Sequence, residues 1–129
     1  MMRFRDFILK LQKDGRIVEL KKPASLKLEL AGVMKAFDGK PVYCEKVEET
    51  PGARVAGNVF CTRELVCEYL GIGKDELIPK LVNAINNPSK PEVIEAKDAP
   101  ALEVTEPYVD LSKFPIPFHA PKDGGPYFA

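Results

Sequence analysis

The sequence predicts one small α/β or α+β unit with a mixed sheet, followed by a proline-rich extended strap. Two observations carry this prediction. Hydrophobic residues recur at helical and strand spacings as far as residue 87, and prolines crowd the residues beyond it. A chain of 129 residues has room for one modest core that removes roughly two-thirds of its unfolded surface from water. We therefore divide the chain into an N-terminal α/β domain, residues 1–87, and a strap, residues 88–129.

Two helices are expected in the first part of this domain. From Phe4 to Leu11, apolar residues recur at helical spacing, and Gly15 is suited to end the helix in a left-handed conformation. The same spacing returns between residues 26 and 37, where Ser25 is a candidate N-cap.

Two further helices are expected before residue 87. Thr62 is suited to cap a helix that ends at Gly71. The last helix covers residues 75–86, and Pro79 must either lie in its first turn or kink it.

Three short runs rich in β-forming residues predict strands at residues 16–20, 42–47 and 54–60. The turn residues 48–52 separate the last two. The predicted order is therefore α-β-α-β-β-α-α.

The strap differs in composition from the domain. It contains eight of the twelve prolines: Pro88, Pro91, Pro100, Pro107, Pro115, Pro117, Pro121 and Pro126. Such a density excludes regular helix and favours extended segments and turns, with one edge strand expected around Ala101–Thr105. The strap also carries apolar side chains that call for a partner surface: Leu111, Phe114, Ile116, Phe118, Tyr127 and Phe128.

Charge and hydropathy restrict the partners and the location. Lysine plus arginine and aspartate plus glutamate both total 19, which leaves no net field to attract nucleic acid or an anionic membrane. No apolar run approaches the roughly 18 residues of a transmembrane helix, and no signal peptide is recognisable. We expect a cytoplasmic protein whose three cysteines, Cys44, Cys61 and Cys67, are reduced, half-buried thiols.

Few residues offer catalytic or metal chemistry. His119 is the single histidine, which excludes a multi-histidine metal site and leaves a Cys/His dyad as the one thiol option. We favour the plainer interpretation, a partly exposed imidazole hydrogen-bonded to nearby backbone. Glu45, Glu48 and Glu49 alternate with a lysine, which is typical of a solvated face rather than of a metal site. We therefore expect no catalytic residue and no metal ligand in this chain.

Two glycine-containing segments are further candidates for ligand binding. Residues 71–74 end in Gly-Lys but lack the rest of a P-loop, which argues against a nucleotide-binding domain. Asp123-Gly124-Gly125 offers backbone that can approach an anionic ligand, or a tight turn that leads into a terminal strand.

Three segments resemble the UbiD-type (3-octaprenyl-4-hydroxybenzoate carboxy-lyase-like) decarboxylases. Residues 5–23 are similar to the opening helix, strand and turn of the family. Residues 57–71 are similar to its Gly-Asn-x-Phe strand end and the following helix. Residues 109–127 resemble its VDLxxLPIP and DxGPYIT signatures. Two positions depart from the family pattern: Cys61 stands where glycine is common, and Ala129 stands where threonine or another polar residue is usual.

The resemblance implies a larger, homo-oligomeric enzyme of which this chain covers about the first third. In the family, a split β-barrel after these segments holds prenylated FMN with a divalent metal (Mn or Mg) and K. A Glu-Arg-Glu set there decarboxylates aromatic or α,β-unsaturated acids reversibly. The resemblance places Asp123, Gly124, Gly125 and Tyr127 nearest the cofactor, while the chain ends before the catalytic set. We expect the isolated chain to bind no flavin.

Two interpretations of the partner stay open. The chain is either a segment of a decarboxylase whose remainder covers the strap, or a stand-alone binding or assembly subunit that docks on a separate catalytic chain.

Overall fold

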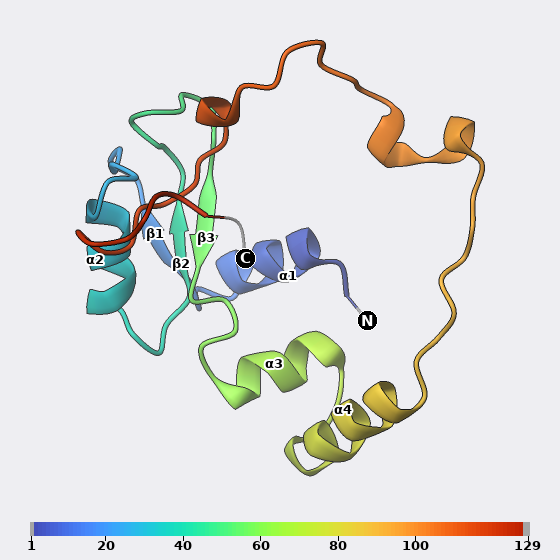
Figure 1. Cartoon of the computed structure of the whole chain (residues 1–129). Helices are drawn as coiled ribbons and strands as arrows, with labels where there is room; N and C mark the ends of the chain where they lie inside the picture. The colour runs from blue at the N-terminus through green and yellow to red at the C-terminus, as the bar shows by residue number, and fades with distance from the viewer. Residues whose placement is uncertain (1, 128–129) are drawn as a thin grey trace.

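The computed structural model describes residues 2–127 and contains a three-stranded sheet with helices on both of its faces (Figure 1). The strands are β1 (Val18–Leu20), β2 (Val42–Cys44) and β3 (Val55–Gly57). The α-helices are α1 (Phe4–Lys13), α2 (Glu29–Ala36), α3 (Arg63–Leu70) and α4 (Leu77–Asn86). Single 3-10 turns cover Lys74–Glu76, Ala96–Asp98, Pro100–Leu102 and Leu111–Lys113. The predicted element order and the small mixed sheet are confirmed.

β2 is the central strand of the sheet. It pairs in parallel with β1 and antiparallel with β3, so that Cys44 lies opposite both Leu20 and Val55. The parallel pair requires a crossover, which α2 supplies, whereas a turn suffices between β2 and β3. Each strand is shorter than its predicted run. Three residues of each strand take part in the ladder.

Two clusters of buried side chains form the core, because successive residues of a strand point to opposite faces. On one face, Tyr43 of β2 packs against the cluster contributed mainly by α1 and α3: Phe7, Ile8, Leu11, Ile17, Val59 and Leu65. On the other face, Cys44 joins the cluster beneath α2: Ala24, Leu26, Leu30, Cys44 and Val47. The sheet is thus covered by α1 and α3 on one face and by α2 on the other (Figure 1).

Contacts among three aromatic rings join α1 to α3. The ring of Phe7, which is completely buried, lies 5.4 Å from the ring of Tyr69. Phe60 contacts both, with its centroid 5.0 Å from Tyr69. Tilted ring pairs at these separations stabilise the packing by more than their buried area alone accounts for.

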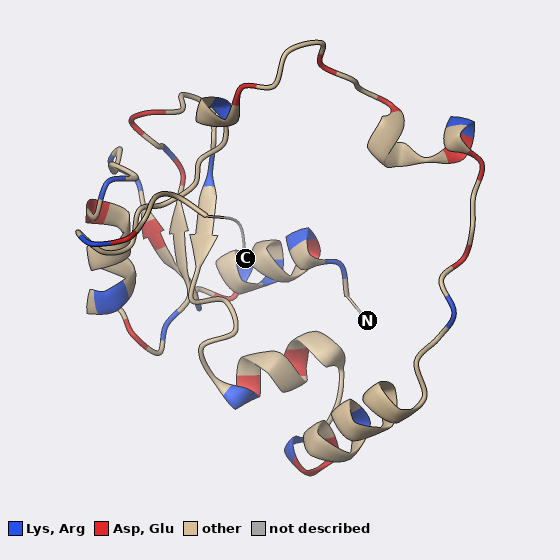
Figure 2. Ribbon diagram, viewed as in Figure 1, with Lys and Arg blue, Asp and Glu red and all other residues tan. Residues whose placement is uncertain are grey.

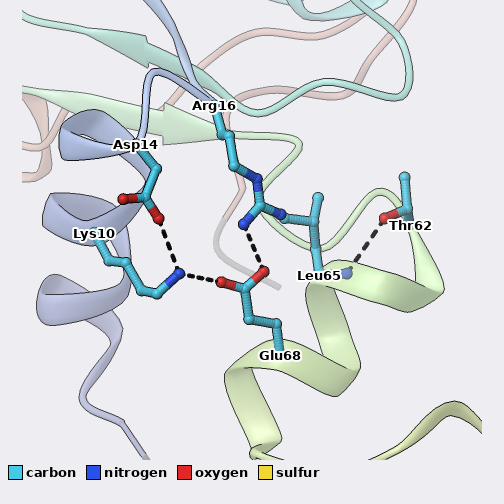
Figure 3. A network of polar contacts seen from close by, with 6 residues as sticks. All are labelled: Lys10, Asp14, Arg16, Thr62, Leu65 and Glu68. Atoms are coloured by element: carbon cyan, nitrogen blue, oxygen red, sulfur yellow. Dashed lines mark hydrogen bonds and ion pairs between the residues drawn. The ribbon is translucent and has the colours of Figure 1, made fainter.

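A polar network joins the same two helices at the surface (Figure 3). Lys10 of α1 forms ion pairs with Asp14, at 2.9 Å, and with Glu68 of α3. Arg16 donates to the other oxygen of Glu68 at 2.8 Å. The hydrogen bond from Lys10, followed by that from Arg16, holds the pKa of Glu68 below its ordinary value.

The predicted ends of the first and third helices are confirmed. The hydroxyl of Thr62 accepts a hydrogen bond from the backbone N–H of Leu65, and Gly71 ends α3 with φ of 67°. Gly15 follows α1 with φ of 65°. Pro79 lies in the first turn of α4, which is the alternative that leaves the helix straight.

The predicted N-cap at Ser25 is wrong. α2 begins at Glu29 after Leu28, a residue with φ of 69°, and Ser25 lies too far upstream to cap it. The hydroxyl of Ser25 donates to Glu49 instead, and its backbone N–H donates to Glu29 at 2.7 Å. The chain therefore makes a further turn between Ser25 and the start of α2.

The predicted edge strand at Ala101–Thr105 is also wrong. Pro100–Leu102 forms a 3-10 turn, and the next residues are irregular and exposed. Prolines at positions 100 and 107 frame this segment, and no described strand lies beside it to supply ladder partners. The strap leaves α4, arcs away from the domain and returns to it near residue 115 (Figure 1).

The cysteines are less accessible than we predicted. All three are free, but Cys44 and Cys67 are buried and only Cys61 is half-buried, so the predicted exposure is wrong for two of them. Burial raises the pKa of the Cys61 thiol.

Acidic and basic residues are interspersed along the chain (Figure 2). Within residues 2–127 no helix has the length and apolar character needed to cross a membrane.

Candidate functional site

The candidate site is the returning end of the strap, which contains the four residues that we predicted to lie nearest a cofactor. Phe118 anchors this segment to the domain. Its N–H donates to the carbonyl of Leu26 at 2.8 Å, and its own carbonyl accepts from the N–H of Leu28 at 3.1 Å. The result is an isolated parallel bridge between Phe118 and Lys27 rather than a fourth strand of the sheet. The chain's own domain thus supplies a partner for this part of the strap.

Glu49 holds the loop that receives Phe118. One of its carboxylate oxygens accepts from the N–H of Leu26 at 2.9 Å, and the other accepts from the hydroxyl of Ser25. The hydrogen bond from the Leu26 N–H, followed by that from Ser25, lowers the pKa of Glu49. Glu49 is exposed, as the predicted solvated face requires. Its contact with Leu26 spans 23 residues and leaves no local pattern in the sequence, so we did not predict it.

A shallow apolar hollow lies between this loop and the strap. It has a volume of about 310 Å³ and is lined by Leu26, Lys27, Glu49, Ile116, Phe118 and Pro126. The strap residues Ile116 and Phe118 are accordingly half-buried. Leu111 and Phe114, which precede them, remain 62% and 51% exposed.

Asp123 closes a tight turn. Its carboxylate accepts from the N–H of Ala120 at 2.9 Å, and its own N–H donates to the carbonyl of Ala120 at 3.0 Å. This reciprocal pair matches the turn interpretation of the segment. One oxygen of the Asp123 carboxylate is engaged within the turn.

Gly124, Gly125 and Tyr127 follow directly. A Cβ atom at position 124 would lie 2.4 Å from the hydroxyl oxygen of Tyr127, so the ring approaches the backbone more closely than a side chain would permit. Gly125 has φ of 151°, a conformation that favours glycine. Tyr127 is 68% exposed. The structure therefore brings Gly124 and Tyr127 into contact, and their nearness to a cofactor stays a prediction. Phe128 and Ala129 lie outside the described residues.

His119 does not form the backbone hydrogen bond that we predicted. Its imidazole is exposed and bonds to none of the residues from 2 to 127. No described thiol or carboxylate pairs with it, so the described chain contains no Cys/His dyad.

The described residues do not fit a metal ion. Nowhere in the described part of the chain do three His, Cys, Asp or Glu side chains gather closely enough to hold one. No metal-dependent step is assigned to this chain.

The Gly57-Asn58 pair has a structural role that explains why these residue types occur together. A Cβ atom at Gly57 would lie 2.4 Å from the Cε atom of Met34, so α2 packs directly on this strand end. Asn58 has φ of 55° and donates from its side chain to the carbonyl of Met34 at 2.7 Å. The pair thereby joins the end of β3 to the end of α2.

Known proteins are similar to this chain in sequence and in fold. The model of the 3-octaprenyl-4-hydroxybenzoate carboxy-lyase N-terminal domain matches residues 8–85. Anhydromevalonate phosphate decarboxylase of Methanosarcina mazei is 37% identical over 98% of this chain and 28% of its own length. The corresponding enzyme of Methanocaldococcus jannaschii is 27% identical over 81% of the chain and 24% of its own length. The chain thus spans about a quarter of the length of these relatives.

Solved structures give the same result. An evolved dimeric form of the UbiD-class enzyme HmfF from Pelotomaculum thermopropionicum, in complex with prFMN, superposes with a TM-score of 0.82 at 26% identity, over 95% of this chain and 29% of that one. The 3,4-dihydroxybenzoic acid decarboxylase AroY of Klebsiella pneumoniae superposes with a TM-score of 0.76 at 27% identity, over 95% of this chain and 28% of its own. The match reaches beyond the α/β domain and into the strap, because each covers 95% of the chain. On these grounds, the chain belongs to the UbiD family of decarboxylases and contains its N-terminal domain.

Proposed function

We propose that this chain is the N-terminal structural portion of a UbiD-class carboxy-lyase that reversibly decarboxylates an aromatic or α,β-unsaturated acid with prenylated FMN. The flavin supplies the electron-accepting chemistry, with a divalent metal and K beside it, and all three belong to the remainder of the enzyme. The enzyme is a homo-oligomer and cytoplasmic. The chain alone is inactive.

One observation carries this proposal. The similarity to an enzyme in complex with prFMN covers 95% of this chain but only 29% of that enzyme. The match of the family's N-terminal domain to residues 8–85 supports the same placement. Curated relatives that act on anhydromevalonate phosphate and a solved relative that acts on 3,4-dihydroxybenzoic acid keep both substrate classes open.

The strap connects the two portions in this proposal. Phe118 ties it to the domain, and the turn closed by Asp123 directs the chain toward the flavin-binding part. Asp123, Gly124, Gly125 and Tyr127 then lie nearest to the cofactor. The exposed strap side chains Tyr108, at 84%, and Leu111, at 62%, pack on the remainder of the enzyme.

The alternative is a stand-alone binding or assembly subunit that docks on a separate catalytic chain. The same exposed apolar side chains favour it, because they would form its docking surface. The two proposals differ in whether the reading frame continues past Ala129 into a sequence with an arginine and paired glutamates. A stop codon there, with no partner chain carrying those residues, would favour the alternative.

A chimaera tests the enzyme proposal. This chain replaces the matched first quarter of the Methanosarcina relative, and the product is purified from cells that make prenylated FMN. We expect a flavin absorbance band and carbon dioxide release from anhydromevalonate phosphate, because the catalytic portion is retained. The 129-residue chain purified in the same way serves as the control, and we expect no flavin band from it.

Two results would contradict the proposal. One is a stoichiometric flavin band on the 129-residue chain alone. The other is a chimaera that binds flavin and has the expected circular dichroism spectrum but releases no carbon dioxide, while the unaltered relative remains active.

A further inference from the structure

A second hollow lies away from the returning segment 123–127. It has a volume of about 720 Å³ and lies between α1 and the residues that lead from the 50–53 turn into β3, with Pro115 of the strap at its rim. Hollows of a few hundred cubic ångströms are of the size that holds small molecules. None of the residues 123–127 lines it, so a ligand in this hollow is independent of the proposed function.

The charge of this hollow is one-sided. Arg5 of α1 and Arg54, which precedes β3, both line it, and no described aspartate or glutamate does. Neither guanidinium forms an ion pair or hydrogen bond with any residue from 2 to 127. Arg16, in contrast, is paired with Glu68. The hollow therefore presents two free cations with no counter-ion from the described chain.

The rest of the lining combines a donor with apolar surface. Tyr43 presents a hydroxyl that is without a partner among the described residues. The amide of Gln12 is already engaged, because it donates to Glu19 at 2.7 Å. The floor contains the buried side chain of Ile8, and the half-exposed ring of Phe4 stands at the edge.

We propose that this hollow binds an organic anion that carries a carboxylate or phosphate group on an aromatic or alkyl body. Guanidinium groups match the geometry of both oxyanions and are weakly hydrated, so little is lost when they contact a ligand. The Tyr43 hydroxyl supplies a third donor. The apolar floor accepts the body of the ligand, which distinguishes this site from one for inorganic anions.

The test uses the isotopically labelled 129-residue chain and follows its nuclear magnetic resonance spectrum during titration. The probe is phenyl phosphate, with inorganic phosphate and phenol as comparisons. We expect phenyl phosphate to shift the side-chain Nε–H signals of Arg5 and Arg54 and the amide of Tyr43. It should bind at least about tenfold more tightly than either comparison, because each one lacks half of the interaction.

Substitution locates the site. Arg5→Gln and Arg54→Gln should each weaken phenyl phosphate binding about tenfold or more, since each removes a charged donor. Arg5→Lys should recover part of the loss by restoring the charge. Arg63→Gln is the matched control, because Arg63 is an exposed, unpaired arginine of α3 that does not line the hollow. All three arginines are exposed, and circular dichroism checks that the variants fold.

Any of three results would overturn the proposal. The first is that phenyl phosphate shifts signals of other residues and leaves those of the hollow unchanged. The second is that Arg63→Gln weakens binding as much as Arg5→Gln. The third is that inorganic phosphate binds as tightly as phenyl phosphate.

Discussion

The α/β domain and the strap contain similar kinds of apolar side chains but bury them very differently. Within residues 2–127, every buried hydrophobic residue lies between Phe7 and Leu77, and Phe7 itself is fully enclosed. In the strap, Val93 is 94% exposed and Tyr108 is 84% exposed. The difference shows that apolar composition does not by itself produce burial. Apolar side chains are buried where regular structure gathers them on one face, or where a loop lies directly against such a face, as at Leu26. The prolines of the strap prevent a regular helix there.

α4 is intermediate between the two regions. It is a regular helix, yet much of its apolar stripe faces outward: Ile78, Leu81, Val82 and Ile85 are between 45% and 78% exposed. Leu77 at its start is buried. Helical spacing thus predicts that a surface is to be covered, but it does not identify the covering partner.

The largest effect on stability is expected from one of a matched pair of substitutions in α1. Leu11→Ala should lower the free energy of unfolding by about 2–5 kcal/mol, because Leu11 is fully buried and its loss leaves a cavity. Leu9→Ala, two residues away at a position that is 57% exposed, should change it by less than about 0.5 kcal/mol. Urea unfolding measures both. Equal effects would mean that the core does not lie where the structure places it.

The cap of α3 should have the next largest effect. Thr62→Ala removes the acceptor of the Leu65 N–H and should cost about 1 kcal/mol in urea unfolding. Thr105→Ala in the strap is the control, since Thr105 is exposed and caps no described helix. A loss of the same size at Thr105 would show that the strap is more ordered than its exposure indicates.

The network between α1 and α3 should contribute less to stability, and its contribution should be lost in acid. Glu68→Gln removes a carboxylate that contacts two cations and should cost less than about 1 kcal/mol at pH 7, because the side chains of Lys10 and Arg16 are 39% and 43% exposed to water. Folding lowers the pKa of Glu68 from its ordinary value of 4.5. The stabilisation is therefore present above pH 4.5 and is lost as the pH falls through the folded-state pKa.

Urea unfolding of both proteins at pH 7 and at pH 3 checks this sign. The difference between them should shrink at pH 3. Glu48→Gln controls for the loss of a negative charge, because the Glu48 side chain bonds to no described residue. A difference that grows at low pH would be incompatible with the network.

The smallest effect is expected in the strap. Tyr108→Ala should change the free energy of unfolding by less than about 0.5 kcal/mol, because the ring is 84% exposed. Tyr69→Ala is the matched substitution in the domain, and it should cost at least about 1 kcal/mol because it removes a ring that packs on Phe7 and Phe60. If the two variants were equally destabilised, the contrast between the regions would fail.

Local patterns predicted the elements well, and they failed where contacts with residues distant in sequence decide the structure. Thr62 and Gly71 marked the ends of α3 correctly, because capping depends on residues within one turn. Ser25 was assigned as a cap by the same rule, but Glu49, distant in sequence, engages its hydroxyl instead. The strand expected at Ala101–Thr105 had suitable residues but no described neighbour to pair with.

In the candidate site, the turn at Asp123 and the need for glycine at position 125 follow from residue type. The bridge from Phe118 to Lys27 does not, because it joins residues that are about 90 positions apart.

The sequence by itself determined the order of helices and strands, the extended course of the strap and the family, because short-range spacing and signature residues suffice for these. Tertiary structure alone decided what covers the apolar face of each element, that Glu68 bridges two cations, that Glu49 holds the loop under Phe118, and that Arg5 and Arg54 line one hollow. These contacts join residues far apart in the chain, and their geometry depends on how the whole domain packs.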